Sequence, residues 1–148
     1  MIMITHVLFA VLVCLVFNVP LDFGVFLGST LPDIDYPHSR IGEMFFPLSD
    51  WINKKFGHRS LFHSIYWSLL LGGLCFVETK FITLFIGYTS HVFLDMFTYT
   101  GVKLLYPLNV SFTLFDGFVQ TGKSKDKFLA VICGLVSVVL IVRKYLIL

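Results

Sequence analysis

The fold is decided by residues 3–31, which read MITHVLFAVLVCLVFNVPLDFGVFLGSTL. Residues 3–19 are apolar almost throughout. Residues 21–31 are apolar again but too short to cross a bilayer, which takes about 20 residues of helix. Between them, Asn18-Val-Pro20 interrupts the pattern, because a proline stops the helix that precedes it. The pattern therefore predicts a helical hairpin over residues 3–31 that turns back toward its starting side.

Three more apolar segments follow, at residues 61–77, 81–100 and 128–148. Of the 148 residues, 57% are hydrophobic and only 14% are charged, whereas a soluble domain carries about 25% charged residues. So few charges cannot cover a soluble surface. We expect an all-α, polytopic helical membrane protein, in which the short N-terminal hairpin and three further membrane helices form one domain over residues 1–148. The first segment lacks the basic start and cleavage site of a signal peptide, so we expect it to be retained.

The polar stretches, residues 32–60 and 101–127, carry eight of the 11 lysines and arginines. If the hairpin returns to its starting side, both stretches share one face, and the positive-inside rule puts that face in the cytoplasm. This predicts a multi-pass protein of the inner (cytoplasmic) membrane, with its amino end inside, its carboxyl end outside and membrane lipid as its partner. The net charge of +2 is too small to indicate nucleic-acid binding.

Histidines and aspartates stand at the ends of these apolar segments. One histidine begins the first helix, two aspartates follow the return helix, two histidines flank the start of the third segment, and a His/Asp pair lies toward the end of the fourth. With the predicted topology, all of them fall toward the same face. Ionisable groups at membrane depth are costly and usually have a partner and a function. The seven residues are His6, Asp33, Asp35, His58, His63, His91 and Asp95.

The sharpest local pattern is His91-Val-Phe-Leu-Asp95. A spacing of four residues puts both side chains on one face of a helix, and Tyr88 and Thr98 continue that stripe. A histidine and a carboxylate so placed can bind one ion, or the carboxylate can bridge two. The alternative is that Asp95 hydrogen-bonds His91 or a neighbouring helix and binds no metal.

Two aspartates and one arginine extend the candidate site. In Leu31-Pro-Asp33-Ile-Asp35-Tyr-Pro37, the prolines predict an extended segment, whose alternate residues point the same way, so Asp33 and Asp35 could face one group of cations. Arg59, between His58 and His63, either contacts lipid headgroups or holds a substrate phosphate. His38 and Asp116 are interpreted as loop and turn residues. The three cysteines lie inside apolar runs without CxxC spacing, so no thiolate metal site is expected.

The same residues carry a family resemblance. In order, they are TH at 5–6, GSTLPDIDYPHS at 28–39, HRSLFHS at 58–64, GYTSHVFLDMFT at 87–98 and GVKLLYP at 101–107. Over residues 4–108 the chain resembles the family of LexA-regulated, membrane-bound predicted metal-dependent hydrolases, although Phe62 stands where that family often has threonine. The resemblance implies a helical membrane fold and a metal site made by the seven residues. It also implies distant similarity to zinc-dependent phospholipase C and P1 nuclease, which cleave phosphoesters with a zinc cluster.

Seven nitrogen and oxygen ligands exceed the four or so that one zinc ion takes. We therefore expect two or three divalent ions, with zinc as the expected metal. Such a cluster activates water and clamps both oxygens of an in-line displacement. The hypothesis is hydrolysis of a phosphoester, with a phospholipid as one candidate, at the cytoplasmic headgroup level. Asp95 or Asp33 would bridge the metals, and Arg59 would steady the phosphate.

Two other classes of function remain open. The first is a non-enzymatic membrane protein in which a structural metal ties the helices together; it predicts bound zinc without turnover. The second is a metal transporter. It ranks last, because transporter sites lie near the midplane between repeats, whereas this sequence has no internal repeat and its candidate ligands gather at one face.

Overall fold

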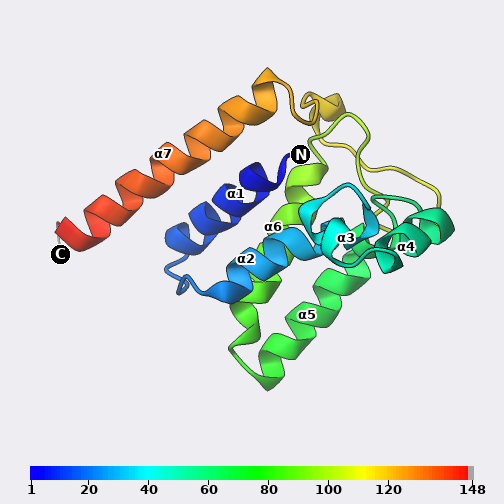
Figure 1. Ribbon diagram of the computed structural model, residues 1–148. Helices are drawn as coiled ribbons and strands as arrows, with labels where there is room; N and C mark the ends of the chain where they lie inside the picture. The colour runs from blue at the N-terminus through cyan, green and yellow to red at the C-terminus, as the bar shows by residue number, and fades with distance from the viewer. Residues whose placement is uncertain (147–148) are drawn as a thin grey trace.

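Residues 1–146 are described by a computed structural model, which contains seven α-helices within that range (Figure 1). In the described part of the chain there is no β-strand. Two isolated bridges, Thr98 with Val119 and Val102 with Phe112, hold the long loop after the sixth helix. The predicted all-α class is therefore confirmed.

The N-terminal hairpin consists of α1 (Met3–Val16) and α2 (Phe23–Thr30). In the turn between them, Asn18 adopts a left-handed conformation (φ 54°), which asparagine tolerates better than most residues. Asp22 then caps α2 by accepting a hydrogen bond from the Gly24 N–H at 2.7 Å. The two helices pack side by side (Figure 1). The chain thus turns back, and the start of α1 comes to lie at the same end as the end of α2.

Helix α6 (Phe81–Asp95) is central, with α1 and α2 against it on one side and α5 (Ile65–Val77) on another (Figure 1). Two glycines let α2 approach α6 closely. A Cβ on Gly28 would lie 2.3 Å from the Leu84 carbonyl oxygen, and one on Gly87 would lie 2.5 Å from that of Val25. Any side chain at either position would push the helices apart. The close contact sets the position of the segment that follows α2.

That segment is η1 (Leu31–Asp35), a 3₁₀-helix and not the extended strand that the prolines predicted. Pro32 is tolerated because the first turn of a helix does not use its N–H groups. With three residues per turn, Asp33 and Asp35 point in different directions, and the two reach overlapping groups of histidines that share His63. That both face one group of cations stays a prediction. The chain continues through α3 (Arg40–Met44), α4 (Leu48–Phe56) and η2 (Leu61–His63).

After α6, a loop containing η3 (Phe115–Gly117) leads to α7 (Ser124–Leu146), which runs alongside α1 (Figure 1). Asp126 connects the start of α7 to the start of α1 by hydrogen bonds. Its buried carboxylate accepts hydrogen bonds from the Thr5 hydroxyl at 2.6 Å, the Ile2 N–H at 2.9 Å and the Gly122 N–H at 2.8 Å. The amino end is thereby held within the bundle.

The predicted spanning helices are not confirmed. Within residues 1–146, no helix combines the length and the apolar character needed to cross a bilayer. Segment 61–77 yields only the 13 residues of α5, and segment 81–100 only the 15 residues of α6. Helix α6 stops because the chain turns at Asp95, whose carbonyl accepts from the Thr98 N–H, while Leu114 donates to the Met96 carbonyl. Segment 128–148 lies in the 23-residue α7, and its positions 147–148 fall outside the described residues.

Candidate metal centre

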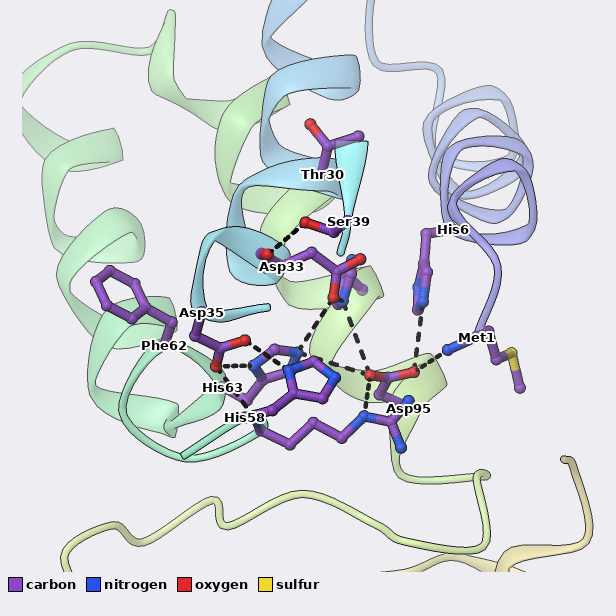
Figure 2. A network of polar contacts seen from close by, with 12 residues as sticks. Met1, His6, Thr30, Asp33, Asp35, Ser39, His58, Phe62, His63 and Asp95 are labelled. Carbon is purple, nitrogen blue, oxygen red and sulfur yellow. Dashed lines mark hydrogen bonds and ion pairs between the residues drawn. The ribbon is translucent and has the colours of Figure 1, made fainter. Parts of the chain in front are cut away.

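The structure gathers all seven predicted site residues at one end of the helical bundle (Figure 2). They come from the first turn of α1, from η1, from the loop before η2, from the end of η2 and from the last turns of α6. Together they form three overlapping groups in which the nitrogen and oxygen atoms are close enough to hold a metal ion. The groups are His6 with His91 and Asp95, Asp33 with His63 and His91, and Asp35 with His58 and His63.

His91 presents one ring nitrogen to the site and anchors the other. Its Nδ1 lies 2.6 Å from the Ser29 carbonyl oxygen. A carbonyl only accepts, so Nδ1 carries the proton and Nε2 keeps a free lone pair. This Nε2 lies 3.6 Å from Asp33 Oδ1 and 3.8 Å from Asp95 Oδ2. The close packing of α2 on α6 therefore determines which nitrogen of His91 can bind a metal.

His63 is oriented in the same way, but by a carboxylate. Its Nδ1 lies 3.1 Å from Asp35 Oδ2, and its Nε2 lies 3.6 Å from Asp95 Oδ2 and 4.0 Å from Asp33 Oδ1. Asp35 also lies 2.6 Å from His58 Nδ1 and accepts a hydrogen bond from the Arg59 backbone N–H at 3.1 Å. One buried carboxylate thus holds the two histidines that flank η2.

His6 and Asp95 complete the centre. The ring of His6 stacks on that of His91, with the ring centres 3.6 Å apart and the planes 8° from parallel. His6 Nε2 lies 3.4 Å from Asp95 Oδ1, whereas the Nε2 atoms of His63 and His91 lie near Oδ2. The two oxygens of Asp95 therefore face different histidines. The α-amino group of Met1 also lies 2.7 Å from Oδ1 (Figure 2).

Arg59 lies behind Asp95. Its Nε forms an ion pair with Asp95 Oδ2 at 2.8 Å, and its Nη1 donates to the hydroxyls of Thr98 and Thr100. The side chain is mostly buried, and its φ of 60° is left-handed. The Nε and Nη1 groups of the guanidinium are therefore already paired with side chains of the protein. The phosphate-binding role suggested by the sequence stays a prediction.

Two cavities border this region. One, of about 270 Å³, reaches Asp33 and is lined further by residues that include Thr30, Tyr36, His38, Ser39 and Arg40. The other, of about 190 Å³, is lined by His58, Arg59, Thr100, Gly101, Lys103 and Ser111. Among the ligand atoms, those of His6, His63, His91 and Asp95 are fully buried, whereas the Asp33 side chain is 16% exposed. Solvent therefore reaches the cluster at Asp33 and at His58, whose side chain is 29% exposed.

Comparison with known proteins places the chain in a family. The family model described as YdjM inner membrane protein matches residues 1–147. The chain belongs to the YdjM family. The hydrolase activity implied by the resemblance found in the sequence stays a prediction.

Relatives of this YdjM-family chain occur in distant bacteria. It is 34% identical to the protein YvsG of Bacillus subtilis over 113 residues, which cover 74% of this chain and 69% of YvsG. It is 33% identical to the inner membrane protein YdjM of Escherichia coli over 112 residues, or 70% of this chain. The matched part spans 57% of the length of the Escherichia coli protein. No solved structure matches the chain.

The donor atoms of this YdjM-family chain fit a metal site. Both ring nitrogens of His6 and Nε2 of His63 and of His91 are buried without a hydrogen-bond partner among the described residues, which is costly for polar atoms. In tetrahedral zinc coordination, bonds of about 2.0–2.2 Å place neighbouring ligand atoms about 3.3–3.5 Å apart. The imidazole–carboxylate separations of 3.4–4.0 Å around Asp95 and Asp33 are close to that spacing. The contacts of Asp35 with His58 and His63, at 2.6 and 3.1 Å, are hydrogen-bond distances.

Asp35 and His63 form a buried pair in which each group shifts the pKa of the other. Burial lowers the pKa of the His63 imidazole, but the carboxylates of Asp35 and Asp95 outweigh burial and raise this pKa to about 9. Burial likewise raises the pKa of Asp35, yet attraction to His63 and hydrogen bonds from His58 and His63 leave it below its usual value. Asp35 is therefore an ionised acceptor that stabilises a proton on Nδ1 of His63, which leaves Nε2 as the atom facing the centre.

Sequence reasoning missed the partners that orient these side chains. The carbonyl of Ser29 and the hydroxyl of Thr100 give no signal in a sequence. Thr98 was noted only as part of a helical stripe, and it lies beyond the end of α6. The role of Asp126 in holding the start of α7 to the start of α1 was also missed, because its partner Thr5 is 121 residues away. His38, interpreted as a loop residue, lines the cavity at Asp33.

Proposed function

We propose that this protein is a membrane-bound, metal-dependent hydrolase of phosphoesters that acts at the cytoplasmic face of the membrane. The observation that carries the proposal is the position of Asp95. Its two carboxylate oxygens face different buried imidazoles, and the Nε2 atoms of those imidazoles form no hydrogen bond among the described residues. A carboxylate shared between two metal ions is the arrangement of two-metal phosphoesterases.

The donor set divides into two sites. The stacked rings of His6 and His91 both lie at Asp95, and their Nε2 atoms are near different carboxylate oxygens. We assign His6 and Asp95 Oδ1 to one ion, and His63, His91, Asp33 and Asp95 Oδ2 to the other. Nitrogen and oxygen donors in small number favour zinc. Asp35 and His58, predicted as ligands from the sequence, are assigned to the surrounding shell that orients His63.

When bound, divalent ions supply a Lewis acid and a water of lowered pKa. The chain supplies the rest. Asp95 holds the two sites in a fixed relation, and Arg59 in turn fixes the carboxylate of Asp95 through its Nε. Asp33 forms the accessible edge, where a substrate enters. The buried imidazoles surround the site with rigid, oriented donors and leave little room for bulk water, which strengthens electrostatic interactions inside it.

The apolar surface supports a location at the membrane. Along α7, one exposed face carries Val131, Leu135, Val138 and Val142 at helical spacing. Beside the candidate site, the α3–α4 region exposes Met44 by 79% and Phe46 by 64%, together with Phe45, Leu48 and Trp51. Lys54 and Lys55 follow on α4. Apolar and basic side chains so combined are typical of segments that lie in a lipid interface. The relatives named inner membrane protein agree with this location.

The test is metal analysis combined with an assay. The protein is purified in detergent, its metal is counted by elemental analysis, and cleavage of bis-p-nitrophenyl phosphate and of phospholipid micelles is measured. We expect about two zinc ions per chain, with metal and turnover both lost in Asp95→Asn. Asp116→Asn, which changes an exposed aspartate, is the matched control. A folded wild-type protein without metal overturns the site, and metal without turnover favours the structural alternative.

A further inference from the structure

The proposed metal ligands differ in how far solvent reaches them. The side chains of His6, His63, His91 and Asp95 are at most 1% exposed, and only Asp33 among the proposed ligands reaches solvent, with 16% of its side chain exposed. Asp33 lines the cavity of about 270 Å³ described above. Of the two cavities at the cluster, this one contains a proposed metal ligand, and we call it the Asp33–Arg40 cavity.

The cavity that Asp33 lines also contains an arginine. Arg40 lines the cavity and forms no ion pair within residues 1–146, whereas Arg59 is committed to Asp95. The hydroxyl of Ser39, the residue before Arg40, connects η1 to the start of α3. Its Oγ donates to the Asp33 carbonyl at 2.7 Å (Figure 2). It also accepts a hydrogen bond from the Gly42 N–H at 2.8 Å. The start of α3, with its arginine, is thus held at a fixed place relative to Asp33.

We propose that the Asp33–Arg40 cavity binds the phosphoryl group of the substrate, with Arg40 as its anion-binding residue. The guanidinium is a planar fork that matches phosphate oxygens, and it stays charged at every relevant pH. It supplies positive charge in the cavity that Asp33 lines, so an anion bound there would be attracted both by Arg40 and by the proposed metal ions. The inference rests on the proposed function and adds the residue that recognises the substrate.

The size of the cavity limits the substrate. Ligand pockets for drug-sized molecules are about 300–1,000 Å³, and this cavity is slightly smaller, at about 270 Å³. It accommodates a phosphate with a small alcohol, such as a glycerol headgroup. A polynucleotide does not fit. The acyl chains of a phospholipid would have to remain outside, next to the apolar side chains of the α3–α4 region.

The second cavity provides a control from the same chain. It also contains a cation, Lys103, but it is lined by none of the five residues proposed to bind metal. If general positive charge near the cluster attracted the phosphate, loss of Lys103 would matter as much as loss of Arg40. If the anion sits between Arg40 and the metal ions, only Arg40 matters.

The experiment measures binding of inorganic phosphate to the zinc-loaded protein in detergent by isothermal titration calorimetry. We expect Arg40→Gln to raise the dissociation constant about tenfold to a hundredfold, Arg40→Lys to recover part of this loss, and Lys103→Gln to change it less than about twofold. Metal content is measured in each variant and should not change. Equal weakening in Lys103→Gln, no weakening in Arg40→Gln, or no phosphate binding by the wild type overturns the inference.

Two substrate arms distinguish the source of the phosphate and separate this inference from the proposed function. Glycerol 3-phosphate represents a free phosphoester, and micelles of phosphatidylglycerol represent a lipid headgroup; competition with inorganic phosphate shows which of them the cavity takes. Phosphate binding that depends on Arg40 in a protein with no turnover supports the cavity and refutes the hydrolase. Turnover that does not depend on Arg40 supports the hydrolase and refutes the cavity.

Discussion

Replacing Asp35 with asparagine tests whether this residue orients His63 or binds a metal itself. The carboxylate lies 2.6 Å from His58 Nδ1 and 3.1 Å from both His63 Nδ1 and the Arg59 N–H. Asparagine keeps the size of the side chain but loses the charge and one of the two acceptor oxygens. Each hydrogen bond to a charged group contributes about 1.5–3 kcal/mol. The substitution therefore frees the His63 ring to turn Nε2 away from the centre.

The expected loss can be compared with the behaviour of other metal sites. Removing an outer partner of a metal-binding histidine costs about 10–100-fold in metal affinity, or about 1.4–2.8 kcal/mol, which agrees with the loss of one charged hydrogen bond. We expect Asp35→Asn to bind the full number of zinc ions with an affinity about 10–100-fold lower. The assay is competition with a chromogenic chelator, with the bound metal counted separately.

Two matched variants and one outcome decide the interpretation. Asp33→Asn removes a proposed ligand and should lower the metal count, and Asp116→Asn should change neither count nor affinity. If Asp35→Asn instead binds one ion fewer and holds the rest with unchanged affinity, Asp35 is a ligand of a third ion. The assignment of Asp35 to the surrounding shell is then wrong, and the three-ion cluster expected from the sequence is favoured.

Three further predictions concern stability. Gly28→Ala should lower the free energy of unfolding by about 1–3 kcal/mol, because its Cβ would lie 2.3 Å from the Leu84 carbonyl oxygen. Gly73→Ala has open space around its Cβ and should raise the free energy of unfolding slightly. Thermal unfolding in detergent measures both. Asp126→Ala should cost about 3 kcal/mol or more, because it leaves two backbone N–H groups and the Thr5 hydroxyl without their acceptor; an unchanged melting temperature would contradict this. A chelator should lower the melting temperature of the wild type, since zinc at 1,000 times its dissociation constant stabilises by about 4 kcal/mol, and zinc should restore it.

The convergence of the site residues could be predicted from the sequence. It required only that the chain turn back at Asn18-Val-Pro20 and that His91 and Asp95 share a helix face, and both features depend on local backbone preferences. Proline stopped the first helix as predicted, but at Pro32 it stands in the first turn of η1 and not in an extended segment. The arrangement of elements around the site followed from topology alone.

The lengths of the helices and the roles of individual atoms could not be predicted. Segment 81–100 remains apolar beyond Asp95, but the loop at Leu114 pairs with the Met96 carbonyl and ends α6 earlier. Whether a histidine offers Nδ1 or Nε2 depends on its neighbour in space, which is the Ser29 carbonyl for His91 and a carboxylate for His63. Contacts of this kind join residues far apart in the chain, and no local pattern encodes them.

Helix spacing and metal chemistry are coupled in this fold. Gly28 sets the distance between α2 and α6, and the next residue, Ser29, fixes the tautomer of His91 through its carbonyl. A bulkier residue at position 28 moves that carbonyl away from Nδ1, so the proton is no longer held there and Nε2 is no longer reserved for the centre. Gly28→Ala should therefore weaken metal binding as well as the fold, although it lies outside the ligand set. Gly73→Ala changes a helix glycine without this connection and should leave metal affinity unchanged.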